Sequence, residues 1–360
     1  MKKQYPFYIK ATVILFGLTL LTYALSGLRD ILTPICFSIM LAILLNRLVI
    51  QLEKWKLPKF WAIFISILLA FTLIACLAYF ISSQIMSFGD DLPVLKAKFT
   101  ELFSRFQHIL QIDMGMPMKQ QDQWLAEAET SMKPLIGQTI GTVAGTLGIT
   151  FLLPVYTFLL LYYKPLFLHF LYEIFAETDS EKVAEVLKET KRAVQRYMIG
   201  LILEGTVVAL LNTTALFLFG IKYAILLGVI GALLNLLPYI GGVIAILLPV
   251  MVATITKDGI QTQLGITAAY LLIQFIDNHV LIPLLVSSRV QINAFVSIVI
   301  VLLGGALWGI SGMFLSIPFI GVLKIIFDRI DELKPWGKLL GTEEVTVQKL
   351  TIGRRKRKTI

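Results

Sequence analysis

Residues 223–256 of this 360-residue chain, YAILLGVIGALLNLLPYIGGVIAILLPVMVATIT, decide its fold. Residues 237–242, LPYIGG, separate two apolar runs. A helix of about 15 residues, the length of each run, measures about 23 Å, whereas the hydrocarbon core of a bilayer is about 30 Å thick. Non-helical backbone at membrane depth is tolerated only where it is buried in protein or lines a cavity. The stretch therefore predicts a broken membrane segment whose tip lines a cavity.

A second interrupted run extends from Asn293 to Phe327 and has its break at residues 304–312, GGALWGISG. One uninterrupted apolar segment, residues 262–286, lies between the two broken runs. Interrupted hydrophobic segments that occur as a pair indicate the binding site of a secondary transporter. We therefore expect the functional site to lie between the two breaks and the 262–286 segment.

The composition assigns the whole chain to the membrane proteins. Hydrophobic residues make up 57% of the chain, charged residues only 15%, and the mean hydropathy is +0.81. An ordinary soluble domain is about half apolar and about a quarter charged. The first apolar run, Phe7 to Leu25, is too long for a signal peptide and lacks a small-residue cleavage site. The sequence predicts an all-α polytopic membrane protein with about eight hydrophobic segments, two of them broken.

Hydropathy and charge divide the chain into five regions. Residues 1–83 are N-terminal membrane spans that form a scaffold, and residues 84–137 are an amphipathic helical region outside the bilayer. Residues 138–196 hold a fourth span and an amphipathic helix, residues 197–330 are the transport half with the sequence motifs, and residues 331–360 are a basic tail. The uninterrupted spans are predicted at 7–27, 31–50, 60–83, 138–162, 198–219 and 262–286.

The distribution of basic residues predicts the orientation. Lysines and arginines gather before the first span, in residues 47–59, in residues 164–196 and in the tail. Residues 84–137 instead carry five Lys or Arg against seven Asp or Glu. The positive-inside rule therefore places both termini in the cytoplasm and residues 84–137 outside. The run Arg354–Lys358 then indicates contact with anionic lipid rather than nucleic acid.

The same charge pattern constrains the broken runs. Both must cross the membrane, which gives eight spans, or both must be re-entrant hairpins from opposite faces, which gives six spans and two hairpins. A single crossing run would leave the basic tail on the wrong side. The sequence alone leaves the two arrangements open.

The motifs of several enzyme classes are missing. The chain has no Gly-x-Ser-x-Gly, Walker-type or His-Glu-x-x-His sequence. Cys36 and Cys76 lie inside predicted helices, and the three histidines show no spacing typical of a metal site. We therefore expect no catalytic residues, no cofactor and no bound metal, and the predicted function is not enzymatic.

The polar residues of the 262–286 segment are the strongest site candidates. A charge at the centre of a bilayer costs at least about 2.5 kcal/mol, so an intramembrane carboxylate indicates function. Gln274, Asp277 and Asn278 are spaced i, i+3 and i+4 and are expected on one helix face. Pro283 frees a backbone carbonyl nearby. Together these groups suit a cation, a proton or a hydroxylated solute; a polar seam between helices is the alternative.

Further candidates lie in the other segments. Glu204 is a second intramembrane carboxylate, which either couples transport to protons or pairs with Arg196. Asn235 is expected to help build the first loop tip. We expect both tips to line the substrate pathway, with the residues Pro238, Tyr239, Gly241 and Gly242 in the first and Gly304, Gly305, Gly309 and Gly312 in the second.

These motifs carry a family resemblance. The stretch from Gly228 through Asn235 and Pro238–Gly242 to Pro249 resembles the signature of the autoinducer-2 exporter family of bacterial permeases, also called the PerM-like family. The Gln274–Asn278 motif with Pro283, and the glycines at 304, 305, 309 and 312 followed by Pro318, match the same signature. The resemblance covers nearly the whole chain. Glu204 departs from it, because a neutral residue such as Gln is more usual there.

The resemblance implies a homo-oligomeric transporter in the bacterial inner membrane, with a pentamer as the expected assembly. Its partners would be the lipid bilayer and a small-molecule or cation substrate. Some relatives are associated with export of the quorum-sensing signal autoinducer-2, and others are similar to sodium(lithium)/proton antiporters. The sequence therefore predicts a secondary transporter that exports a small solute such as autoinducer-2. A cation/proton antiporter is the first alternative and a membrane scaffold without transport the second.

Overall fold

The computed structural model describes residues 6–114, 152–236, 241–257, 259–286 and 292–342. Throughout these ranges the secondary structure is helical, without strands, and six helices are long and apolar enough to cross a membrane. This confirms the predicted all-α polytopic membrane fold.

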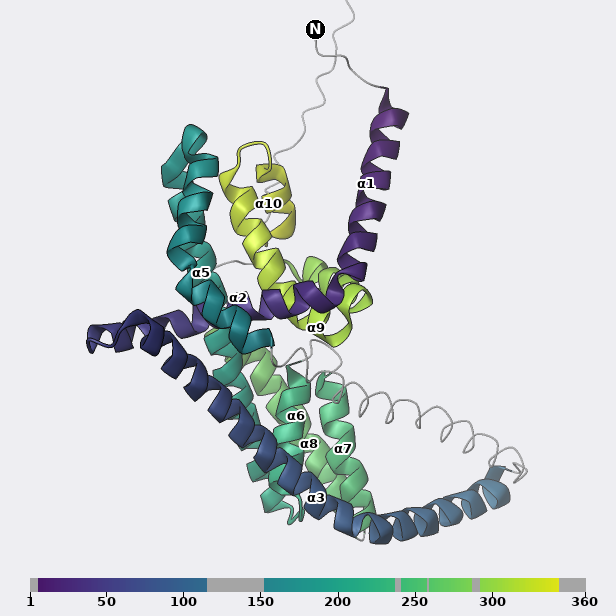
Figure 1. The fold of residues 1–360 in the computed structure, drawn as a ribbon. Coiled ribbons are helices and arrows are strands. Elements are labelled where there is room, and N and C mark those ends of the chain that lie inside the picture. The colour runs from purple at the N-terminus through teal and green to yellow at the C-terminus, as the bar shows by residue number, and fades with distance from the viewer. Residues whose placement is uncertain (1–5, 115–151, 237–240, 258, 287–291, 343–360) are drawn as a thin grey trace, which may run out of the picture.

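Figure 1 shows the order and arrangement of the described helices. Their bounds are α1 Phe7–Gly27, α2 Arg29–Lys54, α3 Lys59–Met114, an unlabelled helix Leu152–Tyr162, α5 Lys164–Leu218, α6 Ala224–Asn235, α7 Gly241–Thr256, α8 Gln261–Ile276, the π-helix η1 Asp277–Val286, α9 Ala294–Arg329 and α10 Lys334–Leu340. The amphipathic region begins inside α3, and residues 115–151 lie outside the described part.

The first broken run forms a helical hairpin. Helices α6 and α7 pack side by side (Figure 1). The two ends of the hairpin also meet, because a methyl group on Gly220 would lie 3.2 Å from Lys257 Nζ. Gly241 is buried at the start of α7, where a Cβ would overlap the carbonyl of Leu234. The close approach of α6 and α7 at this point therefore requires glycine.

The second broken run also folds back on itself within α9. Trp308 and Gly309 leave helical geometry, and Gly309 has a φ of 63°. Ser316 Oγ donates to the carbonyl of Ile300 over 3.0 Å, although residues 16 positions apart lie about 24 Å apart along a straight helix. The start of α9 returns to α10, where Asn293 N donates to Leu340 O at 3.0 Å. Both broken runs are therefore hairpins rather than straight rods.

Helix α5 joins the two halves of the bundle. Its C-terminal half packs in one buried core with α6, α7 and α8. Its middle packs in another core, where Val194 and Tyr197 meet Met40 of α2 and Leu315 of α9. Figure 1 accordingly shows α6–α8 along one half of α5, and α9 and α10 beside the other. A third core joins α2, α3 and the helix Leu152–Tyr162.

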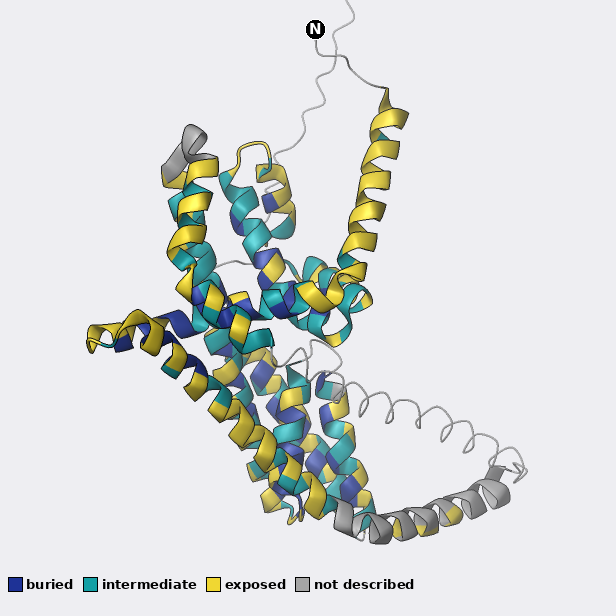
Figure 2. Cartoon of the chain, viewed as in Figure 1, coloured by how far each residue is buried: buried dark blue, intermediate teal, exposed yellow. Residues whose placement is uncertain are grey.

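Much of the apolar surface remains uncovered in the single chain. Helix α1 has no buried residue, and the long apolar stretch of α3 is largely exposed (Figure 2). Large exposed apolar surfaces mark contacts with lipid or with other protein chains. This exposure fits a chain whose solvent is the bilayer.

Candidate functional site

Two carboxyl groups are buried where α5 passes the junction of α8 and η1. Asp277 is 1% exposed and Glu204 is 3% exposed. Asp277 is the first residue of η1, which contains Pro283. Because proline has no backbone N–H, the regular hydrogen-bond ladder cannot continue through it. π-helical turns are wider than α-helical turns and are frequently found at functional sites.

The side chain of Asn235 connects the two carboxyl groups. Asn235 Nδ2 donates to Asp277 Oδ2 at 2.7 Å and to Glu204 Oε1 at 3.2 Å. An amide nitrogen carries two hydrogens, so one side chain can serve both acceptors. Asn235 is the last residue of α6, and the break in the first hairpin begins just after it. Three elements, α5, α6 and η1, therefore meet at one polar cluster.

The glycine-rich tip approaches this cluster. Gln274 Nε2 lies 3.5 Å from Asp277 Oδ2, and a Cβ on Gly242 would lie only 2.6 Å from Gln274 Oε1. A larger residue at position 242 would displace the Gln274 amide. The structure therefore brings Asn235, Gly242, Gln274 and Asp277 together, four of the residues predicted for the pathway.

No cation neutralises the carboxyl groups within the described part of the chain. Its ion pairs all lie elsewhere, among exposed or half-buried residues. Arg196, the alternative partner of Glu204, is exposed and lines a different cavity. Two adjacent negative charges away from water are costly, and one proton or one monovalent cation would neutralise half of that charge.

A cavity of about 10 Å³ adjoins Asp277. Three buried polar atoms that line it have no hydrogen-bond partner: Asn212 Oδ1, Tyr270 OH and Asp277 Oδ1. A space of this size holds about one water-sized particle, and buried water typically makes about three hydrogen bonds. Oxygen atoms are also the ligands that hard cations prefer. The arrangement can therefore hold one water molecule or one small cation between α5, α8 and η1.

Asn212 and Tyr270 were not among the site residues predicted from the sequence. Their positions nevertheless carried a signal, because Tyr270, Gln274 and Asp277 are spaced i, i+4 and i+7 on one face. Glu204 and Asn212 are likewise eight residues apart on one face of α5. Tyr270 lies about one turn from Gln274 on this face, and Asn212 lies about two turns from Glu204.

Other predicted site residues lie apart from the cluster. Asn278 and Pro283 are exposed, so Asn278 does not share the buried face of Asp277. The second tip, with Gly304, Gly305, Gly309 and Gly312, belongs to α9, which packs against α1, α2, α5 and α10. There Trp308 Nε1 donates to the carbonyl of Leu25 at 2.9 Å. Pro238 and Tyr239 lie outside the described residues.

Comparison with known proteins decides the family. The sequence profile of the AI-2E family transporter matches residues 11–332, nearly the whole chain. This chain belongs to the AI-2E transporter family. The family resemblance drawn from the motifs is thereby confirmed, and the chain belongs to a family of membrane transporters rather than enzymes.

Several bacterial relatives cover most of this AI-2E family member at low identity. A putative transport protein of Haemophilus influenzae is 23% identical over 92% of the chain and 96% of its own length. The putative permease PerM of Escherichia coli is 26% identical over 89% of the chain and 92% of its own length. The AI-2 transport protein TqsA of Escherichia coli is 21% identical over 88% of the chain and 91% of its own length.

Proposed function

We propose that this AI-2E family member is a secondary transporter whose site is the cluster of Glu204, Asn235 and Asp277. One observation carries the proposal: a single amide bridges two carboxyl groups that are almost fully buried in an apolar bundle. Stability alone does not explain such a cluster, because apolar residues of similar size are usually as stable or more so. Intramembrane carboxyl groups retained in this way mark transport pathways.

The substrate that we propose is a small polar solute such as autoinducer-2, moved out of the cell. Two facts support it: the distant relative TqsA is named an AI-2 transport protein, and the cluster offers both donors and acceptors to a hydroxylated solute. Alternating access would then move the first hairpin and η1 against α5, because the cluster is built at their junction.

A sodium(lithium)/proton antiporter is the second candidate, and a different observation favours it. The cavity beside Asp277 has space for about one water-sized particle, and three oxygen atoms that line it lack partners. A dehydrated monovalent cation would satisfy all three oxygens, and a proton on either carboxyl group would compete with it by charge. Autoinducer-2 itself is too large for this cavity without a conformational change.

One experiment on the purified protein separates the candidates. Proteoliposomes with wild-type protein are assayed for autoinducer-2 flux and, separately, for internal pH change on addition of sodium or lithium. Autoinducer-2 flux without a cation-driven pH change supports the exporter, and the reverse result supports the antiporter. Protein that is folded and inserted but inactive in both assays would support a membrane scaffold and contradict both transport proposals.

We also propose that the protein lies in the bacterial inner membrane with both termini in the cytoplasm, as a homo-oligomer. The uncovered apolar surface of α1 supports contacts with lipid or with further copies. Ion pairs from Arg329 at the end of α9 to Glu185 and Glu189 of α5 support a common side for the two charged segments. The excess of basic residues in these segments and the tail supports the cytoplasmic side.

A further inference from the structure

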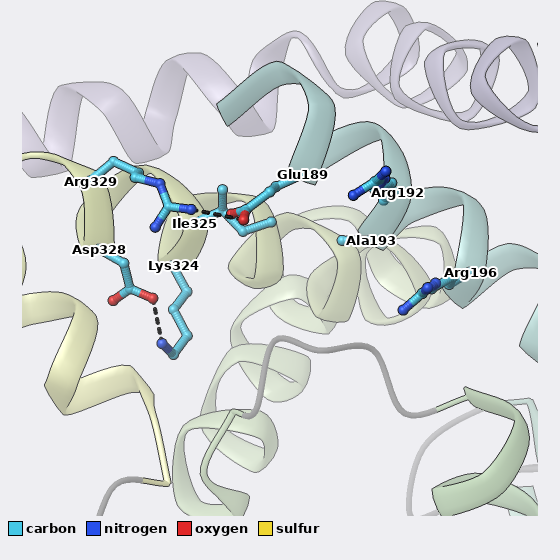
Figure 3. Close-up of a pocket in the computed structure, with 8 residues that line it drawn as sticks. All are labelled: Glu189, Arg192, Ala193, Arg196, Lys324, Ile325, Asp328 and Arg329. Atoms are coloured by element: carbon cyan, nitrogen blue, oxygen red, sulfur yellow. Dashed lines mark hydrogen bonds and ion pairs between the residues drawn. The ribbon is translucent and has the colours of Figure 1, made fainter. Parts of the chain in front are cut away.

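A second and much larger cavity lies between α5 and the end of α9 (Figure 3). Its volume is about 420 Å³, within the range of about 300–1,000 Å³ that is typical of small-ligand sites. It is separate from the carboxylate cluster, and none of its lining residues contributes to that cluster. The transport proposal therefore leaves this cavity unexplained.

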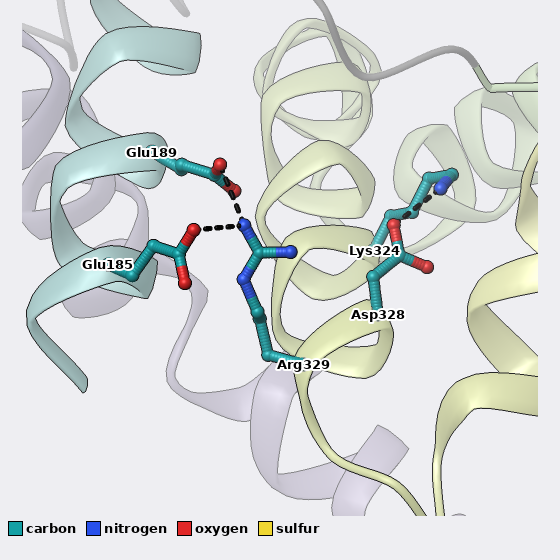
Figure 4. A network of polar contacts seen from close by, with 5 residues as sticks. All are labelled: Glu185, Glu189, Lys324, Asp328 and Arg329. Carbon is teal, nitrogen blue, oxygen red and sulfur yellow. Dashed lines mark hydrogen bonds and ion pairs between the residues drawn. The ribbon is translucent and has the colours of Figure 1, made fainter. Parts of the chain in front are cut away.

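Part of the charge that lines this cavity is already neutralised (Figure 4). Arg329 pairs with Glu185 at 2.9 Å and with Glu189 at 2.7 Å. Lys324 pairs with Asp328 at 2.6 Å, one turn away on α9. These contacts leave no free carboxylate among the lining residues.

Arg192 and Arg196 of α5 have no such partner. Both point from α5 toward the space between α5 and α9 (Figure 3), and neither forms an ion pair with a described residue. They are four residues apart on one helix face, where two like charges destabilise a helix. The lining therefore presents two guanidinium groups, one turn apart, that have no ion-pair partner among the described residues.

A third unused donor lies in the same cavity. Arg329 Nε is buried and has no hydrogen-bond acceptor among the described residues, although Nη2 of the same guanidinium group donates to both Glu185 and Glu189. A buried donor without an acceptor costs free energy unless a ligand or water supplies one. Arg329 is one of the residues that line the cavity, so a ligand bound there can supply this acceptor.

We propose that this cavity binds a phosphate-bearing anion through Arg192 and Arg196. Guanidinium groups match the oxygens of phosphate with two parallel hydrogen bonds, and two of them can share one phosphate. The phosphate belongs either to the headgroup of an anionic phospholipid or to a free phosphorylated solute. The cavity lies where the charged part of α5 gives way to its apolar part, a level that both kinds of ligand can reach.

The test compares three double variants of the full-length protein. Arg192→Gln with Arg196→Gln removes the proposed contacts, and Arg192→Lys with Arg196→Lys keeps the charge without the planar fork. Lys188→Gln with Lys191→Gln is the matched control, because it removes the same charge from the same helix outside the cavity lining. Circular dichroism and elution volume verify folding of each variant.

Binding is measured with two probes on delipidated protein. Native mass spectrometry counts phosphatidylglycerol adducts against phosphatidylcholine, and calorimetry follows inorganic phosphate. Because the glutamine variant loses two cationic contacts to the phosphate group, it should bind about 10- to 30-fold more weakly. The lysine variant should bind with an affinity between those of the wild type and the glutamine variant, because it keeps the charges but loses the paired hydrogen bonds of the guanidinium groups. The control should bind like the wild type.

The two probes identify the source of the phosphate. If the glutamine variant loses binding of phosphatidylglycerol only, the site is assigned to a lipid headgroup. If it loses binding of inorganic phosphate only, the site is assigned to a soluble ligand. Loss of binding of both probes assigns the site to the phosphate group itself. Wild-type binding by the glutamine variant, an equal loss in the lysine-pair control, or no binding of either probe to the wild type would overturn the proposal. Flux through the carboxylate cluster plays no part in these measurements, so they do not depend on the transport proposal.

Discussion

At the scale of single residues, one side chain, that of Asn235, connects the two carboxyl groups. Asn235 Nδ2 donates a hydrogen bond to Glu204 and a shorter one to Asp277. Replacing Asn235 by Leu would leave both buried carboxyl groups without this donor. Loss of a hydrogen bond to a charged group in a buried site costs about 1.5–3 kcal/mol. We expect Asn235→Leu to lower the thermal stability measurably in differential scanning fluorimetry, and Asn235→Gln to restore part of it.

Tyr270 allows function to be separated from stability. Its hydroxyl is buried and has no partner among the described residues, so Tyr270→Phe removes an unsatisfied polar group without changing the ring. We expect an unchanged or slightly higher melting temperature together with weaker transport. A variant that transports like the wild type would exclude the hydroxyl from the pathway. A variant that is strongly destabilised would show that the hydroxyl has a structural partner.

The position of Asn278 shows the limit of sequence reasoning at this scale. Its spacing from Gln274 places it on the same face in an ideal α-helix, yet it is exposed. The helix becomes a π-helix at Asp277, so the period of 3.6 residues per turn no longer holds. The grouping of Gln274 with Asp277 could be predicted, because it is local. The bridge from Asn235 to Glu204 could not, because it requires the packing of α6 on α5.

At the scale of elements, the lengths of the apolar runs predicted the helices well. The spans at 7–27 and 262–286 agree closely with the structure, because each is a long apolar run with turn residues on both sides. Hydropathy could not decide whether a broken run crosses or folds back. That outcome depends on backbone contacts such as Gly304 with Gly312, which the sequence shows only as a pair of glycines.

The second hairpin offers a matched pair of glycine substitutions on α9. A Cβ on Gly312 would overlap the carbonyl of Gly304, whereas a Cβ on Gly321 would meet no atom within 4 Å. We expect Gly312→Ala to separate the two arms and destabilise the protein by about 1–3 kcal/mol, as overpacking of cores does. Gly321→Ala should be neutral or stabilising by about 0.5–1 kcal/mol, because alanine favours the helix. Thermal unfolding of the two variants in the same detergent tests this difference.

At the scale of the whole molecule, the two hairpins predict which loops share a side of the membrane. Lys222 and Ile260 lie at the two ends of the first hairpin, and Asp331 follows the second. The 26-residue span Gln261–Val286 lies between the two hairpins. With Cys36 and Cys76 replaced, Lys222→Cys and Ile260→Cys should react with an impermeant maleimide from the same side, and Asp331→Cys from the opposite side. Labelling of positions 222 and 260 from opposite sides would show that the first broken run crosses.

Transport is proposed to pass through the carboxyl cluster bridged by Asn235. The most direct measurement is flux in proteoliposomes for Asp277→Asn and Glu204→Gln, with Thr214→Val as the control, because Thr214 is exposed on the same helix as Glu204. Each carboxyl variant should insert and elute like the wild type yet lose at least about tenfold in flux, equivalent to about 1.4 kcal/mol. The control should transport normally. Wild-type flux in Asp277→Asn, for whichever substrate the protein moves, would show that transport does not depend on the Asp277 carboxyl group and would contradict the proposed pathway.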